Sequence, residues 1–314
     1  MIAPVVVTPG DPRGIGPEVA LRSLDLLAGE SAGPTVSIIG PEGPMSPNEL
    51  ARVATQARTF GDADAGAWAA RAIEYAVGLA LENETRAIVT APLHKPSLHA
   101  AGRRFPGQTE MLAHLSGAPR VGMLMAAERT RLEGPLRVLL ATTHLPLRAV
   151  ADSVTTTLLD DQIALLDEAL RTDWGLAAPR IVVCALNPHA SDGGLFGDEE
   201  ARVFMPAVHS ARTRGIDVSG PFPADTVFGR ALAGGFDAVV APYHDVGMAA
   251  FKTVAFGSGV NVTLGLPFVR TSPDHGTAFD IAGTGSADPA SMTEAILLAS
   301  RLSRNRFDTP PAHA

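Results

Sequence analysis

The chain has 314 residues, a formal net charge of −8, 46% hydrophobic residues and 18% charged residues. This composition is typical of a globular protein with one large domain or two ordinary ones. The negative charge argues against a general nucleic-acid binder but is compatible with a local basic pocket for an anion. The single cysteine, Cys184, excludes an internal disulfide. With no signal-peptide pattern and no apolar run of about 20 residues, we expect a cytoplasmic protein without a membrane span.

Short apolar runs alternate with stretches of helical spacing along the chain. The apolar runs predict strands at residues 2–7, 35–39, 86–90, 121–125, 136–141, 180–186 and 237–242. Helical spacing and helix-start signals predict helices from Pro17, at 48–58, at 65–81, from 105–110, at 155–171, from about 198 and at 289–302. Because strands and helices alternate, the sequence predicts an α/β fold with a largely parallel sheet.

A turn rich in glycine and proline, residues 8–18, joins the first predicted strand to the first helix. Free backbone N–H groups in such a turn can hold an anion, and a tight strand-to-helix connection is the alternative. The turn has neither the Gly-x-Gly-x-x-Gly fingerprint of dinucleotide sites nor the Gly-Lys-Ser/Thr of a P-loop.

The segment from Pro242 to Gly283 combines many glycines and polar side chains in an otherwise apolar chain. Little of it has helical spacing, so we expect a long functional loop held on a rigid scaffold. Lys252, Asn261 and Arg270 supply two cations and an amide, a set that suits a phosphate or a carboxylate. Taken singly, each of the three has an ordinary structural explanation, and a lone lysine is usually a solvated surface charge, so the prediction depends on their concentration in one segment.

Three histidines, His144, His189 and His244, each follow a strand-like run by a few residues. The carboxyl ends of parallel strands meet at one edge of a sheet, where three imidazoles could share a divalent metal ion. Their spacing is not that of a local zinc motif, so ordinary hydrogen-bonded histidines are the alternative.

Eight segments of the chain together resemble the 4-hydroxythreonine-4-phosphate dehydrogenase family of pyridoxine (vitamin B6) biosynthesis. The resemblance runs from Thr8 to about Asp288. Its segments are TPGDPRGIGPE, TAPLHK, GQTE, ATTHLPL, ALNPHASDGGLFGDEE, GPFPADT, YHDVG and VNVTLGLPFVRTSPDHGTAFDIAG.

The resemblance implies the two-domain fold of isocitrate and isopropylmalate dehydrogenases, with a central cleft. It implies a discontinuous cofactor-side domain of residues 1–104 and 266–314, and a domain for metal, substrate and dimerisation at 105–265. It also implies a homodimer with the active site near the subunit interface, acting on a small phosphorylated hydroxy acid.

Matching positions imply roles for single residues. His144, His189 and His244 would bind one divalent ion (zinc, magnesium, cobalt or manganese), with ligands shared across the dimer. The predicted substrate contacts are Gln108, Thr109, Lys252, Asn261 and Arg270.

The loop at residues 275–283 resembles the adenosine-binding loop of the wider group of decarboxylating dehydrogenases. It would hold NAD, with NADP as the alternative, through His275, Gly276 and Asp280. Asp280 can accept hydrogen bonds from the ribose and disfavour a 2′-phosphate, which favours NAD.

The implied reaction moves a hydride from the carbon bearing the secondary hydroxyl of 4-(phosphooxy)-L-threonine to NAD. The metal polarises the hydroxyl oxygen, and the resulting β-keto acid loses CO2 to give 3-amino-2-oxopropyl phosphate. A base must accept the hydroxyl proton, and Lys252 and Asp225 are both candidates.

Two positions depart from the family pattern. Gln108 stands where a histidine is usual, and glutamine does not titrate near neutral pH. Val246 replaces a common glutamine. Gln108 keeps open a related substrate, 4-phosphothreonate or 4-phosphoerythronate. A cis-dihydrodiol dehydrogenase is disfavoured by the presence of Lys252 and Arg270, and a non-catalytic binding module by the complete set of histidines.

Overall fold

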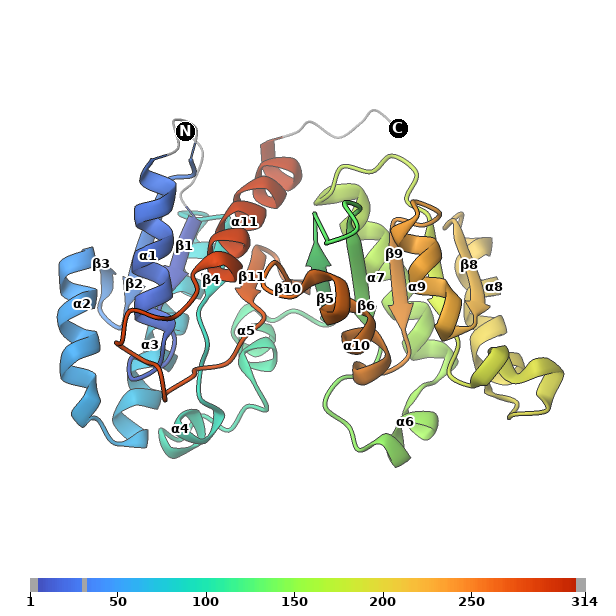
Figure 1. Cartoon of the computed structure of the whole chain (residues 1–314), viewed down its shortest axis with the longest axis horizontal. Helices are drawn as coiled ribbons and strands as arrows, with labels where there is room; N and C mark the ends of the chain where they lie inside the picture. The colour runs from blue at the N-terminus through green and yellow to red at the C-terminus, as the bar shows by residue number, and fades with distance from the viewer. Residues whose placement is uncertain (1–4, 30–32, 309–314) are drawn as a thin grey trace. The chain divides into compact units, whose positions relative to one another are not determined.

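Figure 1 shows the computed structural model, which describes residues 5–29 and 33–308. Strands alternate with helices, so the predicted α/β fold is confirmed. Contacts divide the chain into two compact units: Met1–Val121 with Val260–Ala314 form unit 1, and Gly122–Gly259 form unit 2. Residues 105–121 and 260–265, which the sequence analysis assigned to the metal-side domain, fall in unit 1. The reason is that they supply a helix and a strand to the core of unit 1.

The sheet of unit 1 has the strand order β3-β2-β1-β4-β11-β10. Its strands are β1 (Val5–Thr8), β2 (Val36–Gly40), β3 (Gly43–Met45), β4 (Ala87–Thr90), β10 (Val260–Leu264) and β11 (Val269–Pro273). β1 and β11 each pair in parallel with β4, whereas β3 and β10 run antiparallel to their neighbours. Residues 2–4 of the first predicted strand lie outside the described part of the chain.

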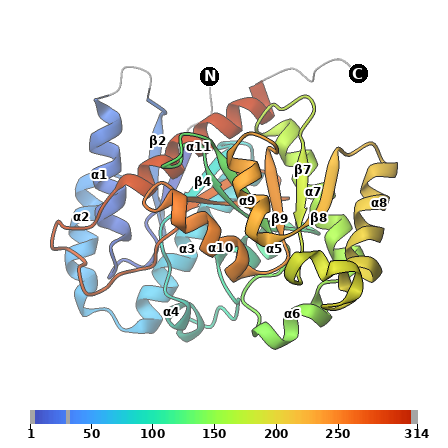
Figure 2. The same ribbon diagram turned by 45° about the vertical axis from the view of Figure 1, so that its right-hand side comes forward.

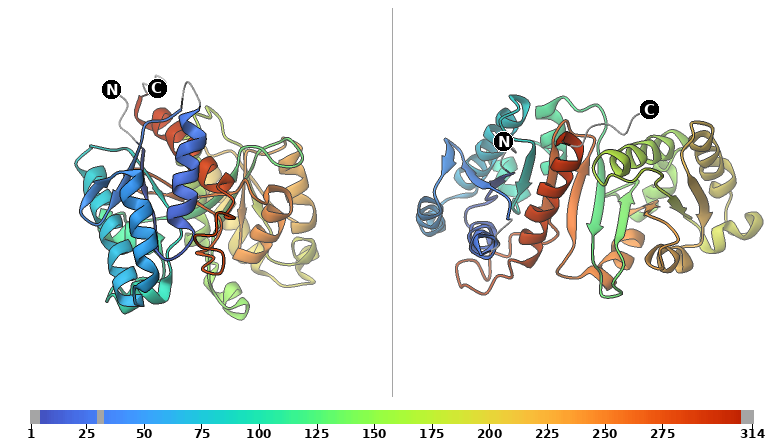
Figure 3. Two further views of the ribbon diagram at one scale, coloured as in Figure 1. Left: turned by 60° about the vertical axis from the view of Figure 1, so that its left-hand side comes forward. Right: turned by 90° about the horizontal axis from the view of Figure 1, so that it is seen from above.

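Helices cover both faces of this sheet (Figure 3). One face packs against α1 and α11, and the other against α3 and α5. The helices of unit 1 are α1 (Gly16–Ala28), α2 (Pro47–Gln56), α3 (Asp62–Leu81), α4 (Lys95–Ala100), α5 (Gln108–Ser116) and α11 (Ala290–Asp308).

The sheet of unit 2 has the strand order β5-β6-β9-β7-β8, parallel except for the pair of β5 and β6. Its strands are β5 (Gly122–Ala127), β6 (Leu136–Leu140), β7 (Ile181–Cys184), β8 (Val218–Phe222) and β9 (Ala238–Ala241). Helices α9 and α10 share one hydrophobic cluster on one face (Figure 2). The helices are α6 (Leu147–Ser153), α7 (Thr156–Thr172), α8 (Met205–Thr213), α9 (Ala224–Leu232) and α10 (His244–Ala255).

The segment from Pro242 to Gly283 is not the long loop that its composition predicted. It contains helix α10 and strands β10 and β11, and only the stretch after β11 is irregular. Gly247, Phe251 and Ala255 form the buried stripe of α10. A Cβ at Gly247 would lie 2.5 Å from a methyl carbon of Leu140, so this glycine lets the helix approach the sheet. The helix was missed because a glycine that is needed for packing weakens the helical pattern.

Among the helices of the described residues, each is too short or too polar to cross a membrane.

Gly66 provides a test of the packing in unit 1. A Cβ at this position of α3 would lie 1.9 Å from the backbone oxygen of Ser97 in α4. Backbone atoms cannot move aside cheaply, so we expect Gly66→Ala to lower the free energy of unfolding by about 1–3 kcal/mol. A thermal melt followed by circular dichroism measures the change.

Gly78 of the same helix is the matched control, because a Cβ there would meet no atom within 4 Å. Gly78→Ala should be neutral or stabilising by up to about 1 kcal/mol, since alanine favours a helix. Equal melting temperatures for the two variants would refute the close approach of α3 and α4.

Candidate active site

One face of the sheet in unit 1 changes from apolar to polar along its strands. Val6, Ile88 and Phe268 belong to the buried cluster beneath α3 and α5. Side chains alternate between faces, so Thr8, Thr90 and Arg270, two positions further on, lie on the same face. The antiparallel register places Thr263 of β10 opposite Arg270 and Asn261 opposite Ser272, which adds two more polar side chains. The face therefore ends in a polar patch at the end of β4.

Arg270 is the charged member of this patch and is only 3% exposed. Its Nη1 donates to the hydroxyl of Thr263 at 2.8 Å, and its Nε and Nη2 donate to the hydroxyl of Thr90 at 3.2 and 2.7 Å. Among the described residues, no carboxylate lies within ion-pair distance of this guanidinium. Burial lowers the pKa of Arg270 to about 10, while the charge of Glu110 acts in the opposite direction. A buried cation that only hydroxyl groups bind favours the entry of an anion.

In the described part of unit 1, three buried side-chain oxygen atoms have no hydrogen-bond partner: Oγ1 of Thr8, Oε1 of Gln108 and Oδ1 of Asn261. Gln108 begins α5, and its Nε2 donates to the backbone oxygen of Ala91 at 3.0 Å, which fixes the amide. Buried acceptors without a donor cost free energy. They would be satisfied by hydroxyl or ammonium groups of a ligand that also carries the anion. Thr109, the next residue of α5, is half-buried.

His144 and His244 line one cavity of about 220 Å³ in unit 2. His144 follows β6 and His244 begins α10 after β9, and these two strands are parallel neighbours. Their ring centroids are 5.4 Å apart. The Nδ1 of His244 is 2.7 Å from a carboxylate oxygen of Asp245, an arrangement that leaves Nε2 available to a ligand.

His189, the third predicted metal ligand, is exposed in a left-handed turn after β7. Within residues 5–29 and 33–308, no group of three or more His, Cys, Asp or Glu side chains has the geometry of a metal site. The two predicted bases lie on the helices that cover one face of unit 2. Lys252 is in the last turn of α10, and Asp225 is in the first turn of α9.

The loop that contains His275, Gly276 and Asp280 lies against the turn after β1 in unit 1. The backbone N–H of Ile15 donates to the oxygen of Thr277 at 2.9 Å, and a Cβ at Gly14 would lie 2.7 Å from that same oxygen. The early glycine-rich turn therefore serves as a docking surface for the loop, a role that the sequence analysis did not assign to it.

Further along the loop, the carboxylate of Glu18 accepts hydrogen bonds from the backbone N–H groups of Gly283 at 2.9 Å and Ala287 at 3.1 Å. A cavity of about 270 Å³ is lined by this part of the loop with α1 and α2, including Arg13 and Arg58. His275, Gly276 and Asp280 do not line this cavity. The Nε2 of His275 is buried and has no hydrogen-bond partner in the described part of the chain, whereas Asp280 is exposed.

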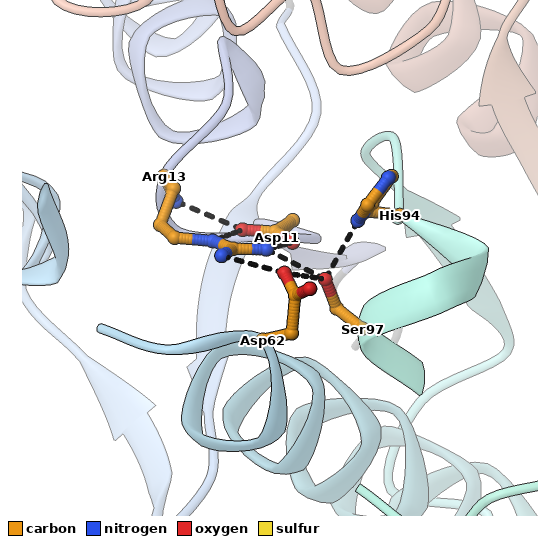
Figure 4. Close-up of polar contacts among 5 residues, drawn as sticks. All are labelled: Asp11, Arg13, Asp62, His94 and Ser97. Atoms are coloured by element: carbon orange, nitrogen blue, oxygen red, sulfur yellow. Dashed lines mark hydrogen bonds and ion pairs between the residues drawn. The ribbon is translucent and has the colours of Figure 1, made fainter. Parts of the chain in front are cut away.

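Figure 4 shows the polar network on which the loop rests. Arg13 donates to Asp11 at 2.9 and 3.0 Å, to Asp62 at 2.8 Å and to Ser97 at 2.6 Å. The side-chain bond to Asp11 is the main cause that raises the pKa of Arg13, and Arg13 in turn lowers the pKa of Asp62. The Nδ1 of His94 is 2.7 Å from Oγ of Ser97. Because its charge is already neutralised, Arg13 has a structural role that differs from that of Arg270.

The ring of Phe279 sits on this network. Its centroid is 5.1 Å from that of His94 in an edge-to-face arrangement, and the guanidinium carbon of Arg13 is 5.4 Å from it. The network thus holds the middle of the loop through an aromatic contact and a cation–π contact.

Sequence reasoning missed Thr90 and Thr263, the two residues that bind Arg270. One signal was available in the sequence. The apolar run of β4 ends in a polar residue, Thr90, whose side chain lies on the same face as that of Ile88. Their meeting with Arg270 depends on the register of three strands, and no local pattern encodes that register.

Comparison with known proteins identifies the family. A family model described as "Pyridoxal phosphate biosynthetic protein PdxA" matches residues 29–299. A 4-hydroxythreonine-4-phosphate dehydrogenase of Burkholderia vietnamiensis is 42% identical over 96% of this chain and 97% of its own. A Salmonella typhi protein provisionally named D-threonate 4-phosphate dehydrogenase is 43% identical over 92% of this chain and 85% of its own.

Solved structures agree with this result. The structure of 4-hydroxythreonine-4-phosphate dehydrogenase from Klebsiella pneumoniae is similar with a TM-score of 0.83 and 39% identity, over 96% of this chain and 98% of that one. A β-decarboxylating dehydrogenase from Thermococcus kodakarensis is similar in fold alone, with a TM-score of 0.54 and 15% identity over 96% of this chain and 83% of that one. The predicted fold of the isocitrate dehydrogenase type is thereby confirmed, as is the predicted resemblance: this chain belongs to the family of the pyridoxal phosphate biosynthetic protein PdxA.

Proposed function

We propose that this protein is an NAD-dependent dehydrogenase that oxidises the secondary hydroxyl of 4-(phosphooxy)-L-threonine. The β-keto acid so formed loses CO2 to give 3-amino-2-oxopropyl phosphate. The names of the relatives at about 40% identity support a dehydrogenase acting on a CH–OH group in pyridoxine biosynthesis. The main structural support for an anionic substrate is that the guanidinium of Arg270 is buried without a counter-ion among the described residues.

Arg270 supports a phosphorylated acid because it is a buried cation whose partners are the neutral hydroxyls of Thr90 and Thr263. A phosphate or carboxylate would supply the missing negative charge, and two of the five N–H groups of a guanidinium remain for it. The unpaired oxygens of Gln108 and Asn261 suit the amino and hydroxyl groups of the same substrate. Lys252 and Thr109 are the further contacts that we assign to it.

A divalent metal ion fits the imidazoles of His144 and His244, which line one cavity. Imidazole ligands favour zinc or cobalt over magnesium. When bound, the metal would supply a Lewis acid toward the substrate hydroxyl. The carboxylate of Asp245 accepts a hydrogen bond from Nδ1 of His244, so that Nε2 would be the atom that holds the metal.

We assign the third ligand to His189, from the same chain or from a second copy in a homodimer. Exposed apolar side chains support an interface near these histidines. Leu147, which lines the cavity with His144, is 71% exposed, and Leu195, six residues after His189, is 72% exposed. Each has an exposed apolar neighbour, Leu145 at 45% and Phe196 at 46%, and exposed apolar side chains that lie together are typical of an interaction surface.

NAD is assigned to the loop with His275, Gly276 and Asp280. The buried Nε2 of His275 has no hydrogen-bond partner among residues 5–29 and 33–308, which suits a hydrogen bond to the nucleotide. The exposed carboxylate of Asp280 can accept hydrogen bonds from the ribose hydroxyls and repel a 2′-phosphate, which favours NAD over NADP. The hydroxyl proton passes to Lys252 or Asp225, both on the helices over one face of unit 2.

The first prediction concerns the substrate. Purified protein with zinc or cobalt should form NADH from 4-(phosphooxy)-L-threonine faster than from 4-phosphothreonate or 4-phosphoerythronate. The absorbance of NADH measures all three rates. A preference for 4-phosphothreonate would agree with the name of the Salmonella relative, and a preference for 4-phosphoerythronate would favour the other phosphorylated sugar acid. Either result would make Gln108 the residue to examine. No reaction with any of them, despite bound metal, would exclude these three compounds and point to another substrate.

The second prediction separates function from stability at Arg270. Arg270→Met should leave the melting temperature unchanged or raise it, because it removes a buried charge that lacks a counter-ion. The same change should lower kcat/KM by about 10²- to 10³-fold, because charge-assisted hydrogen bonds to the substrate are lost.

Arg13→Met is the matched control for this pair of measurements. It leaves the 1% exposed carboxylate of Asp11 without its partner and should destabilise the protein by about 1–3 kcal/mol. If Arg270→Met were the more destabilising change, Arg270 would be a structural residue.

The third prediction concerns the metal. Treatment with a chelator should abolish NADH formation, and zinc or cobalt should restore it. His144→Ala and His244→Ala should each weaken zinc binding, measured by competition with a chromogenic chelator, because each variant removes one ligand atom. His209→Ala, at an exposed position of α8, is the control and should bind zinc as the unchanged protein does. Zinc binding that is insensitive to both substitutions would place the metal elsewhere.

A further inference from the structure

The turn that carries His189 is strained. His189, Ala190, Ser191 and Asp192 have φ angles of 53°, 53°, 69° and 45°, and Gly193 and Gly194 continue the left-handed path at 69° and 98°. Residues other than glycine avoid this region because Cβ crowds the following carbonyl oxygen. Four such residues in succession persist only where other contacts hold them.

The carboxylate of Glu200 provides those contacts. Its Oε1 accepts hydrogen bonds from the backbone N–H groups of Leu186 at 2.9 Å and Asn187 at 2.8 Å. Its Oε2 accepts from Nδ2 of Asn187 at 2.9 Å and from the hydroxyl of Ser191. One side chain therefore binds the chain on both sides of His189.

Glu200 is itself well anchored. It is 4% exposed and begins a π-helical turn, Glu200–Phe204, whose Phe204 is fully buried. Burial alone would raise the pKa of Glu200, but the hydrogen bonds from Asn187 and Ser191 outweigh it and lower the pKa. At neutral pH the side chain is thus a charged acceptor with a fixed position. Its neighbour Glu199 is less buried and accepts a hydrogen bond from Nδ2 of Asn187 at 2.7 Å.

We propose that Glu200 is a positioning residue for the metal site: it holds the left-handed turn so that the imidazole of His189 is presented to the ion that His144 and His244 bind. This proposal rests on the function proposed above, because that function makes His189 a ligand. Without Glu200, the turn would relax toward ordinary φ angles and would no longer hold His189 in place for an ion that His144 and His244 of the same chain or of a second copy bind. Glu200 makes no contact with the metal in this scheme.

The test compares Glu200→Gln with Glu199→Gln in the full chain. Glutamine keeps the shape of Glu200 but replaces one acceptor oxygen by an N–H donor. We expect Glu200→Gln to weaken zinc binding about 10- to 100-fold, a range typical of residues that support metal ligands. Glu199→Gln should stay within about twofold of the unchanged protein. Cobalt substitution gives a second readout, because its visible absorption changes when an imidazole ligand is lost.

A rescue variant distinguishes positioning from general damage. Glycine adopts positive φ freely, so Ala190→Gly lowers the strain that Glu200 must hold. The double variant Ala190→Gly with Glu200→Gln should regain part of the zinc affinity that Glu200→Gln loses. Failure of this rescue, with both proteins folded by circular dichroism, would show that Glu200 acts other than by holding the turn.

Hydrogen exchange of residues 186–196 keeps the test independent of metal binding. Exchange there should be faster in Glu200→Gln than in Glu199→Gln, with or without zinc. Unchanged exchange and unchanged affinity in Glu200→Gln would overturn the proposal. If the unchanged protein bound no divalent metal at all, the proposed function would fail, and the exchange data would still decide whether Glu200 holds the turn.

Discussion

The site in unit 1 depends on one buried charge, the guanidinium of Arg270, which is bound only by hydroxyl groups. A hydroxyl oxygen accepts a hydrogen bond but carries no net charge, so the positive charge of Arg270 is positioned without being neutralised. The register of β4, β11 and β10 creates this arrangement. A slip of one residue in β11 would turn Arg270 to the opposite face, toward α11, and would bring an uncharged threonine or valine into its place.

Arg13, in the same unit, shows the opposite use of an arginine. Asp11 and Asp62 neutralise its charge, and the pKa of Arg13 is raised where that of Arg270 is lowered. Arg13 therefore acts as a fixed support for Phe279 and the loop above it, as Figure 4 shows for its polar partners. The two arginines thus differ in role because their partners differ. Carboxylates give Arg13 a structural role, whereas neutral hydroxyls leave the charge of Arg270 for a ligand.

Sequence patterns predicted the parts of the fold that periodicity controls and missed those that packing controls. The apolar runs located β1, β4, β6, β7 and β9, but α10 was missed because Gly247 is selected for its contact with Leu140. Of the predicted site residues, Asn261 and Arg270 share one face in unit 1, and His144 and His244 share one cavity in unit 2. The left-handed path of Ala190 could not be predicted, because it depends on Glu200, ten residues later.

The division of the chain also sets an order for folding during synthesis. Unit 2 is continuous, so all of its strands have been synthesised once residue 259 is made. Unit 1 is interrupted, and β11, the neighbour of β4, is made only after unit 2 is complete. Until then one edge of β4 has no strand beside it, and an unpaired edge is a template for wrong pairing. The nascent chain therefore carries an incomplete first domain while its second domain folds, and the last 55 residues, Val260–Ala314, complete it.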